Sequence, residues 1–158
     1  MERDRQTEMK DHPTRSSQAA ETLHLRGFNC SQAVFSTLAE SLGFDHSLAL
    51  KIASPFGGGI GRTGETCGAV SGALMALGLQ FGFSEPDPQA KERVYKLTRE
   101  YMRRFQERYG AVACKALIGI DLSTPEGLQK AREQDVFSKK CSQFIDGAVE
   151  IAEQMLSE

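Results

Sequence analysis

No stretch of this chain alternates apolar and polar residues with a period of two, and that absence constrains the fold more than any other feature. Apolar residues instead recur every three or four positions, as at Val94, Leu97, Tyr101 and Phe105, which is typical of an amphipathic helix. Composition agrees, because 30 Ala and Leu residues stand against only 12 Val and Ile, a balance that favours helix over strand. The sequence therefore predicts an all-α fold.

Capping residues and glycines divide the chain into six to eight helices. Asn29, Asp45 and Thr66 are expected N-caps, and the last of these follows a Gly-rich loop with five glycines between Gly57 and Gly64. The expected helices span residues 14–26, 30–42, 46–53, 67–81, 89–109, 114–118, a segment that begins at Pro125, and 138–156. We predict a single-domain helical bundle over residues 14–158, preceded by a frayed N-terminal segment, residues 1–13.

Charge and hydropathy exclude several classes of protein. The 158-residue chain carries 19 Lys and Arg against 21 Asp and Glu, which argues against binding nucleic acid by neutralising phosphates. The longest apolar run, residues 69–83, is interrupted by Ser71 and Gln80 and is too short to span a bilayer, so it is expected to be a buried helix. The start of the chain has no apolar signal region. These features predict a cytoplasmic protein with reduced thiols.

Four cysteines carry the strongest chemical signal. Cys30, Cys67, Cys114 and Cys141 share no CxxC pair, but each falls in or near the first turn of an expected helix. The positive end of a helix dipole favours thiolate, which is both the nucleophile and the metal ligand. The four thiolates are thus expected either to converge on one site or to act as redox dithiols. Four independent core cysteines are the alternative reading, because free cysteine is often buried as a small hydrophobe.

Residues around Cys67 are candidates for holding a cofactor. The loop satisfies G-x-G-x-x-G, but it lies in no βαβ unit, so no NAD site is expected. Its backbone N–H groups instead favour an anion or sulfur acceptor, and Arg62 is expected to promote the Cys67 thiolate. None of the three histidines has a ligand-like spacing to a cysteine. The candidate cofactor-binding residues are Gly61, Arg62, Gly64 and Gly68.

The cysteine pattern resembles a known family. The segments Asn29–Val34 and Gly61–Leu74, with Cys114 and Cys141, resemble the C_GCAxxG_C_C family of redox-active four-cysteine proteins, and residues 67–72 read CGAVSG. This family is similar to the iron–sulfur portion of split-Soret cytochromes, which implies a cluster. No haem is expected, because the chain lacks CxxCH. Related genes often lie near transporter genes, which implies a transporter-associated system as a partner.

Three functions follow from these features. The first is electron transfer by an iron–sulfur cluster whose ligands are Cys30, Cys67, Cys114 and Cys141. The second is thiol/disulfide exchange with Cys67 as the attacking thiol, in any of three pairings. The third is a zinc or copper site without redox turnover. Each of the first two needs a redox partner protein, and the small residues of Gly68–Gly82 are compatible with a homodimer.

Overall fold

The structure is a computed structural model that describes residues 14–158, so the expected fraying of residues 1–13 lies outside it. The described residues form a single helical body without strands, as predicted, and one isolated β-bridge joins Thr66 to Ala113. Eight helices have five or more residues: α1 (Arg15–Leu25), α2 (Cys30–Ser41), α3 (His46–Ala53), α5 (Gly68–Phe81), α6 (Pro88–Tyr109), α7 (Cys114–Ile118), α8 (Pro125–Glu133) and α10 (Cys141–Leu156).

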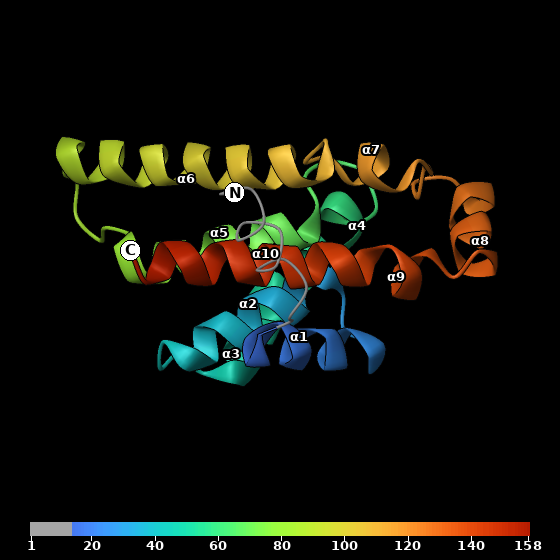
Figure 1. Ribbon diagram of the computed structural model, residues 1–158, viewed down its shortest axis with the longest axis horizontal. Coiled ribbons are helices and arrows are strands. Elements are labelled where there is room, and N and C mark those ends of the chain that lie inside the picture. The colour runs from blue at the N-terminus through green and yellow to red at the C-terminus, as the bar shows by residue number, and fades with distance from the viewer. Residues whose placement is uncertain (1–13) are drawn as a thin grey trace, which may run out of the picture.

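The helices lie in three layers. Helix α10 runs through the middle of the body beside α5, with the long α6 along one edge and α1, α2 and α3 on the other side (Figure 1). Helix α2 packs most extensively against α5 and α3, and α10 contacts α1, α2, α5 and α6. The short elements α7, α8 and α9 (Val136–Lys139) gather at one end. This end holds the candidate site described below.

Local capping sets most of the helix starts. Asn29 forms a reciprocal capping box with Gln32, and Asp45 accepts a hydrogen bond from the Leu48 N–H, as predicted. The expected cap at Thr66 is wrong, because Cys67 is the residue that precedes α5 and its side chain makes no capping bond. The last helix also differs from the prediction, since it is broken at Lys140 into α9 and α10. The break places Cys141 at the first residue of α10.

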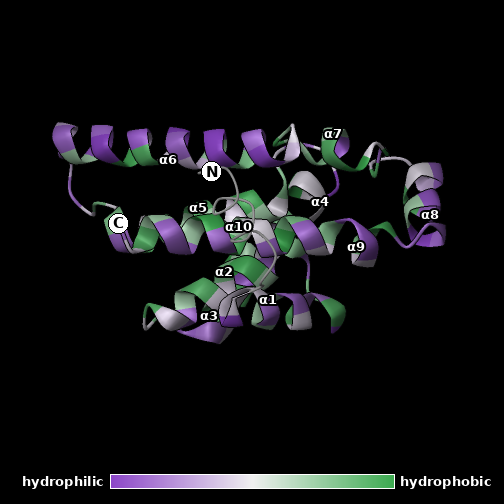
Figure 2. Ribbon diagram, viewed as in Figure 1, coloured by the Kyte–Doolittle hydropathy of each residue, from purple (hydrophilic) through white to green (hydrophobic). Residues whose placement is uncertain are grey.

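Apolar faces turned inward form the core. Hydrophobic residues line the inner faces of α2, α5 and α10, while the outer face of α6 is hydrophilic (Figure 2). Tyr101 and Phe105 of α6 are fully buried, and the Tyr101 hydroxyl donates to the Ala148 carbonyl of α10 at 2.9 Å. The apolar segment 69–83 forms the buried helix α5, and no helix among residues 14–158 is long and apolar enough to cross a membrane.

The Gly-rich segment is an irregular loop despite one helical turn, α4 (Gly57–Ile60). Gly58 and Gly59 lie at φ 67° and 70°, in left-handed backbone that a right-handed helix excludes. Ile60 and Arg62 also have φ 67°. For a residue with a Cβ, this left-handed backbone conformation costs about 1–2 kcal/mol of conformational free energy. The predicted loop is confirmed, and its residues with left-handed backbone reverse the direction of the chain before α5 begins.

Candidate functional site

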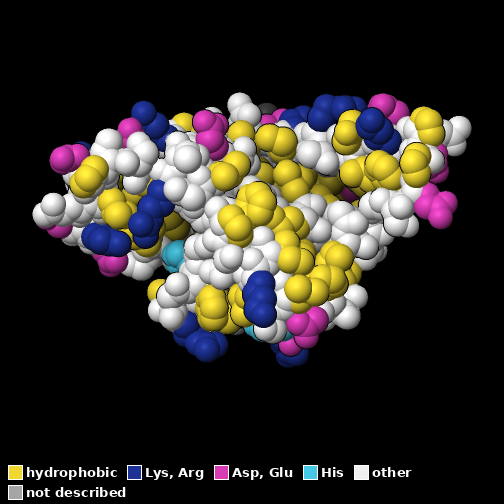
Figure 3. Space-filling view, turned by 180° about the vertical axis from the view of Figure 1, so that it is seen from behind, with side chains coloured by type: hydrophobic (Ala, Val, Ile, Leu, Met, Phe, Trp, Pro, Cys, Tyr) yellow, Lys and Arg dark blue, Asp and Glu magenta, His cyan; other side chains and the backbone are white. Residues whose placement is uncertain are grey.

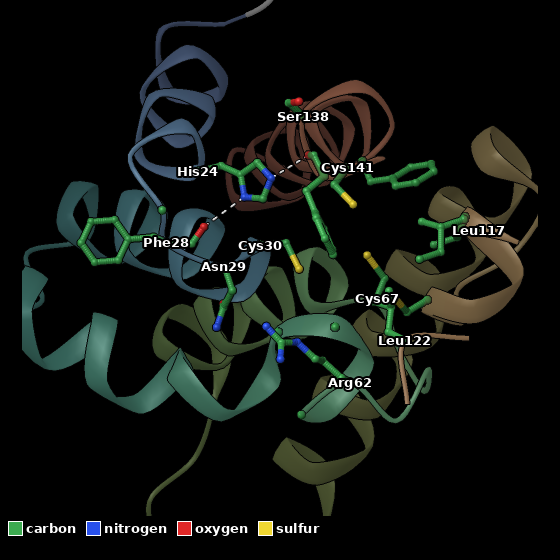
Figure 4. Close-up of a pocket in the computed structure, with 18 of the residues that line it drawn as sticks. His24, Phe28, Asn29, Cys30, Arg62, Cys67, Leu117, Leu122, Ser138 and Cys141 are labelled. Carbon is green, nitrogen blue, oxygen red and sulfur yellow. Dashed lines mark hydrogen bonds between the residues drawn. The ribbon is translucent and has the colours of Figure 1, made fainter. Parts of the chain in front are cut away.

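All four cysteines begin helices and line one cavity. Cys30, Cys114 and Cys141 are the first residues of α2, α7 and α10, and Cys67 immediately precedes α5. The cavity they share has a volume of about 820 Å³. In Figure 4 the labelled cysteines enter it from different helices. The predicted link between cysteines and helix starts is therefore confirmed, and all four side chains line the same cavity, although no three of them are grouped as closely as metal ligands among residues 14–158.

The four thiols differ in their access to solvent. None takes part in a disulfide. Cys67 and Cys114 are buried, at 5% and 8% exposed, whereas Cys30 and Cys141 are half-buried. A reagent that enters the cavity thus meets Cys30 and Cys141 more readily than the other two.

The glycine loop fixes Cys67 and Cys114 relative to each other. The Cys67 N–H donates to the Val112 carbonyl at 2.8 Å, and the Cys114 N–H donates to the Glu65 carbonyl at 2.6 Å. Gly59 packs against the backbone of Glu65 and the side chain of Cys114, and a Cβ at Gly59 would stand 2.7 Å from the Cys114 Cβ. Only glycine fits there, since the position combines this contact with left-handed backbone.

Two glycines of α5 bring its first turn against α2. A Cβ on Gly68 would lie 2.5 Å from the Cys30 Sγ, and a Cβ on Gly72 would lie 2.7 Å from the Ser31 carbonyl oxygen. The absence of both side chains lets the two helices approach until Cys30 and Cys67 meet. The same two glycines therefore set both the packing of α5 on α2 and the approach of Cys67 to Cys30.

Cys30 and Cys67 interact as a thiol pair. A hydrogen bond from Cys67 lowers the pKa of the Cys30 thiol, against the opposing effect of burial, and the backbone N–H groups of Gly58 and Ser31 add to the lowering. The same hydrogen bond and burial raise the pKa of Cys67. These directions favour Cys30 over Cys67 as the thiol that ionises, whereas the sequence favoured Cys67.

The remaining cysteines keep their protons more firmly. Burial, followed by the charge of Cys30, raises the pKa of Cys114 to about 11 and that of Cys141 to about 12. An uncompensated apolar environment disfavours thiolate. In the arrangement described, Cys30 is the one cysteine of the cavity whose pKa is shifted towards reactivity.

His24 is a site residue that the sequence did not reveal. Its Nδ1 lies 3.0 Å from the Phe28 carbonyl oxygen and its Nε2 lies 2.8 Å from the Phe137 carbonyl oxygen (Figure 4). A ring nitrogen donates to its carbonyl only where it carries a proton, so the donor is set by the tautomer. The coulombic influence of His24 is one of the smaller causes that lower the pKa of Cys30. Phe137 lies 113 positions away, so no local spacing could have signalled this contact.

The predicted cofactor-binding residues divide into two groups. Gly61 and Arg62 line the cavity, whereas Gly64 faces the Lys115 side chain and Gly68 packs against the Cys30 Sγ. Cys30, burial and Cys114 are the main influences that raise the pKa of Cys67, and Arg62 is not among them. No three His, Cys, Asp or Glu side chains among residues 14–158 are grouped as ligands of one metal ion.

Fold and site together define a helical protein with four free cysteines around a single cavity. Residues 28–155 match the model of the family described as "Putative redox-active protein (C_GCAxxG_C_C)", and the chain belongs to this family. The predicted resemblance is therefore confirmed. Neither a curated protein nor a solved structure matches the chain.

Proposed function

We propose that this protein is a thiol/disulfide oxidoreductase whose redox couple is Cys30 and Cys67. The observation that carries this proposal is the place of both cysteines where α2 packs against α5, with the Cys30 Sγ against Gly68, the residue that follows Cys67, in a cavity that solvent can enter. Half-buried Cys30 is the more accessible thiol to a disulfide that enters the cavity, and Cys67 is buried. Such a pair matches the attacking and resolving thiols of disulfide exchange.

The exchange has two steps. The Cys30 thiolate attacks one sulfur of a substrate disulfide, forming a mixed disulfide and releasing one substrate thiolate. Cys67 then loses its proton to that thiolate and attacks the Cys30 sulfur, which closes the Cys30–Cys67 disulfide and releases the second substrate thiolate. This thiolate takes a proton from water, to which Cys30 gave its own. The protein dithiol is oxidised by two electrons, and the substrate disulfide is reduced to two thiols.

Mapping the disulfide tests the proposal. Reduced full-length protein is treated with a small excess of an organic disulfide, alkylated and digested. We expect loss of two free thiols and one crosslink, Cys30 to Cys67. Cys30→Ser should abolish this crosslink, whereas Cys141→Ser, the control at the other half-buried cysteine, should leave it intact. A product that pairs other cysteines, or a chain that keeps all four thiols, would overturn the proposal.

An iron–sulfur cluster held by Cys30, Cys67, Cys114 and Cys141 is a second candidate. Two observations favour it: all four line the cavity, and backbone N–H groups of Gly58, Ser31 and Ala69 donate to the sulfurs of Cys30 and Cys67. Such donors tune cluster potentials. A cluster bound by these residues would supply one-electron transfer. No three ligand side chains are grouped around one point in the described part of the chain, so the cluster, like a zinc or copper site, would need the cysteines to move closer together when it binds.

Anaerobic purification separates the two candidates. Iron and acid-labile sulfide in stoichiometric amounts, with broad visible absorption, would favour the cluster over the dithiol. Colourless protein with four titratable thiols would favour the dithiol. A redox partner would reduce the Cys30–Cys67 disulfide again, or would exchange electrons with the cluster. The N-terminal half of α6 offers one docking surface for it, because Lys91, Arg93, Lys96 and Arg99 are all exposed there.

A further inference from the structure

The cavity mouth carries more positive than negative charge. Its lining includes two arginines, Arg62 and Arg132, one imidazole, His24, and one carboxylate, Asp135. The three basic side chains come from separate elements: α1, the glycine loop and α8. The ring nitrogens of His24 lie within hydrogen-bond distance of two backbone carbonyl oxygens, and neither arginine forms an ion pair with any residue in the described range 14–158. Both arginines are exposed.

The backbone of the glycine loop sets the direction of the Arg62 side chain. Arg62 has left-handed backbone, at φ 67°, which few side chains adopt without cost. Its Cγ lies 2.8 Å from where a Cβ on Gly58 would stand, so a glycine at 58 is needed for the side chain to fold back over the loop. In Figure 4 the guanidinium points towards the side of the cavity where Asn29 and Cys30 lie.

The interior of the cavity is apolar. Leu117, Leu122, Phe137 and Phe144 line it together with the cysteines. Figure 3, which views the molecule from behind, shows Lys or Arg side chains beside a hollow with apolar side chains in it, at the left of the view. A cavity of about 820 Å³ is within the range that accepts a small organic molecule. The site thus combines an apolar floor, a reactive thiol and a cationic rim.

We propose that the substrate of Cys30 is a low-molecular-weight disulfide that bears carboxylates, with Arg62 and Arg132 binding those carboxylates at the rim. This inference rests on the disulfide exchange proposed above and names its substrate class. Guanidinium groups bind carboxylates through two parallel hydrogen bonds, which would orient the disulfide over the thiol. Asp135 also lines the cavity, and its one negative charge is outnumbered by the positive charges of the two arginines.

Two aromatic disulfides of opposite character test the proposal. Reduced, full-length, metal-free protein is mixed with bis(nitrobenzoate) disulfide, a dianion, or with dipyridyl disulfide, which is neutral, and the fast phase of thiol release is timed. The phase is assigned to Cys30 by its loss in Cys30→Ser. Arg62→Gln with Arg132→Gln should slow the dianion about five- to tenfold at low ionic strength and the neutral reagent less than twofold. Added salt should slow the reaction of the wild type with the dianion to the rate of the double variant, because it screens the charges of the arginines.

Arg99→Gln, which removes an exposed arginine of α6, is the matched control and should change neither rate. Equal slowing of both reagents by the double variant would overturn the substrate assignment and leave the exchange chemistry standing, because the arginines would then act through the thiol or the fold. If neither reagent gives a fast phase that depends on Cys30 in the wild type, the proposed function itself fails.

Discussion

At the scale of single residues, the reactivity of Cys30 depends on one neighbour. The Cys67 hydrogen bond is the main cause of the lowered pKa of Cys30. Cys67→Ala removes the donor, so the pKa of Cys30 should rise towards the ordinary thiol value, and its alkylation by iodoacetamide should begin at higher pH. The pH profile of the Cys30 alkylation rate, read by peptide mass spectrometry, measures this. A profile unchanged by Cys67→Ala would show that the backbone N–H groups, rather than Cys67, hold the thiolate.

Asp146 on α10 is a residue whose charge opposes folding. Burial, followed by Glu21 of α1 and Glu150 of α10, raises its pKa to about 6, and Arg108 of α6 only partly offsets this. Its Oδ1 has no hydrogen-bond partner among the described residues. The folded state therefore holds the proton more tightly than the unfolded state, and stability falls as pH rises from about 4 to 6.

Asp146→Asn removes this unfavourable charge. The variant should be more stable than the wild type by about 1 kcal/mol at pH 7, a value reduced for the partial exposure of the carboxyl group. The advantage should vanish near pH 4, where both proteins are neutral at this position. Urea unfolding at the two pH values measures it, with Glu92→Gln on exposed α6 as the control. An advantage that is the same at both pH values would mean that packing, not charge, is responsible.

At the scale of elements, α5 contains glycines of two kinds. A Cβ on Gly68 would meet the Cys30 Sγ and the Phe56 carbonyl oxygen, at 2.5 and 2.8 Å, whereas a Cβ on Gly78 would meet nothing within 4 Å. Gly68→Ala should thus cost about 1–3 kcal/mol by overpacking. Gly78→Ala should stabilise the protein by up to about 1 kcal/mol, because alanine is the better helix former. Thermal unfolding of the pair measures both changes, and destabilisation of equal size would contradict this account.

The elements themselves were largely readable from the sequence, for local reasons. Asn29 and Asp45 cap helices through contacts within three residues, and Pro125 occupies the first turn of α8, so neighbouring residues alone specify these boundaries. The break at Lys140 was not readable, because the segment 136–156 carries a continuous helical pattern with no glycine or proline at the break. The Lys140 Nζ lies 3.5 Å from the carbonyl oxygen of Ile118, a residue 22 positions earlier in the chain, so this contact depends on the tertiary fold.

At the scale of the whole molecule, the site was only partly predictable. The four cysteines could be identified, because helix starts and the CGAxxG motif are local features. The pairing of Cys30 with Cys67 depends on the close approach of α2 to α5. That approach depends on Gly68 and Gly72, which contact residues of α2 that lie about 37 positions earlier in the chain. His24 enters the site through a carbonyl of α9. The pairing of the cysteines, and which of the two thiols has the lower pKa, are therefore properties of the tertiary fold.

The proposed Cys30–Cys67 disulfide would link the two helices that share the most extensive contact in the body. Closing a loop between positions 37 apart restricts the unfolded chain and stabilises the fold by about 4 kcal/mol where the crosslink introduces no strain. Oxidised protein should therefore unfold at higher urea concentration than reduced protein, by an amount that disappears in Cys30→Ser and in Cys67→Ser but persists in Cys141→Ser.

Because unfolding and oxidation form one thermodynamic cycle, the same free energy must appear in the reduction potential. Folding makes the couple harder to reduce by the amount that the disulfide stabilises the fold, and 30 mV corresponds to about 1.4 kcal/mol for two electrons. A gain of 4 kcal/mol thus predicts a potential about 85 mV more negative in the folded protein than in urea. Equilibration with redox buffers under both conditions measures this shift. An oxidised form less stable than the reduced one would require a strained bond and a shift of opposite sign, with the couple then acting as an oxidant of its partner.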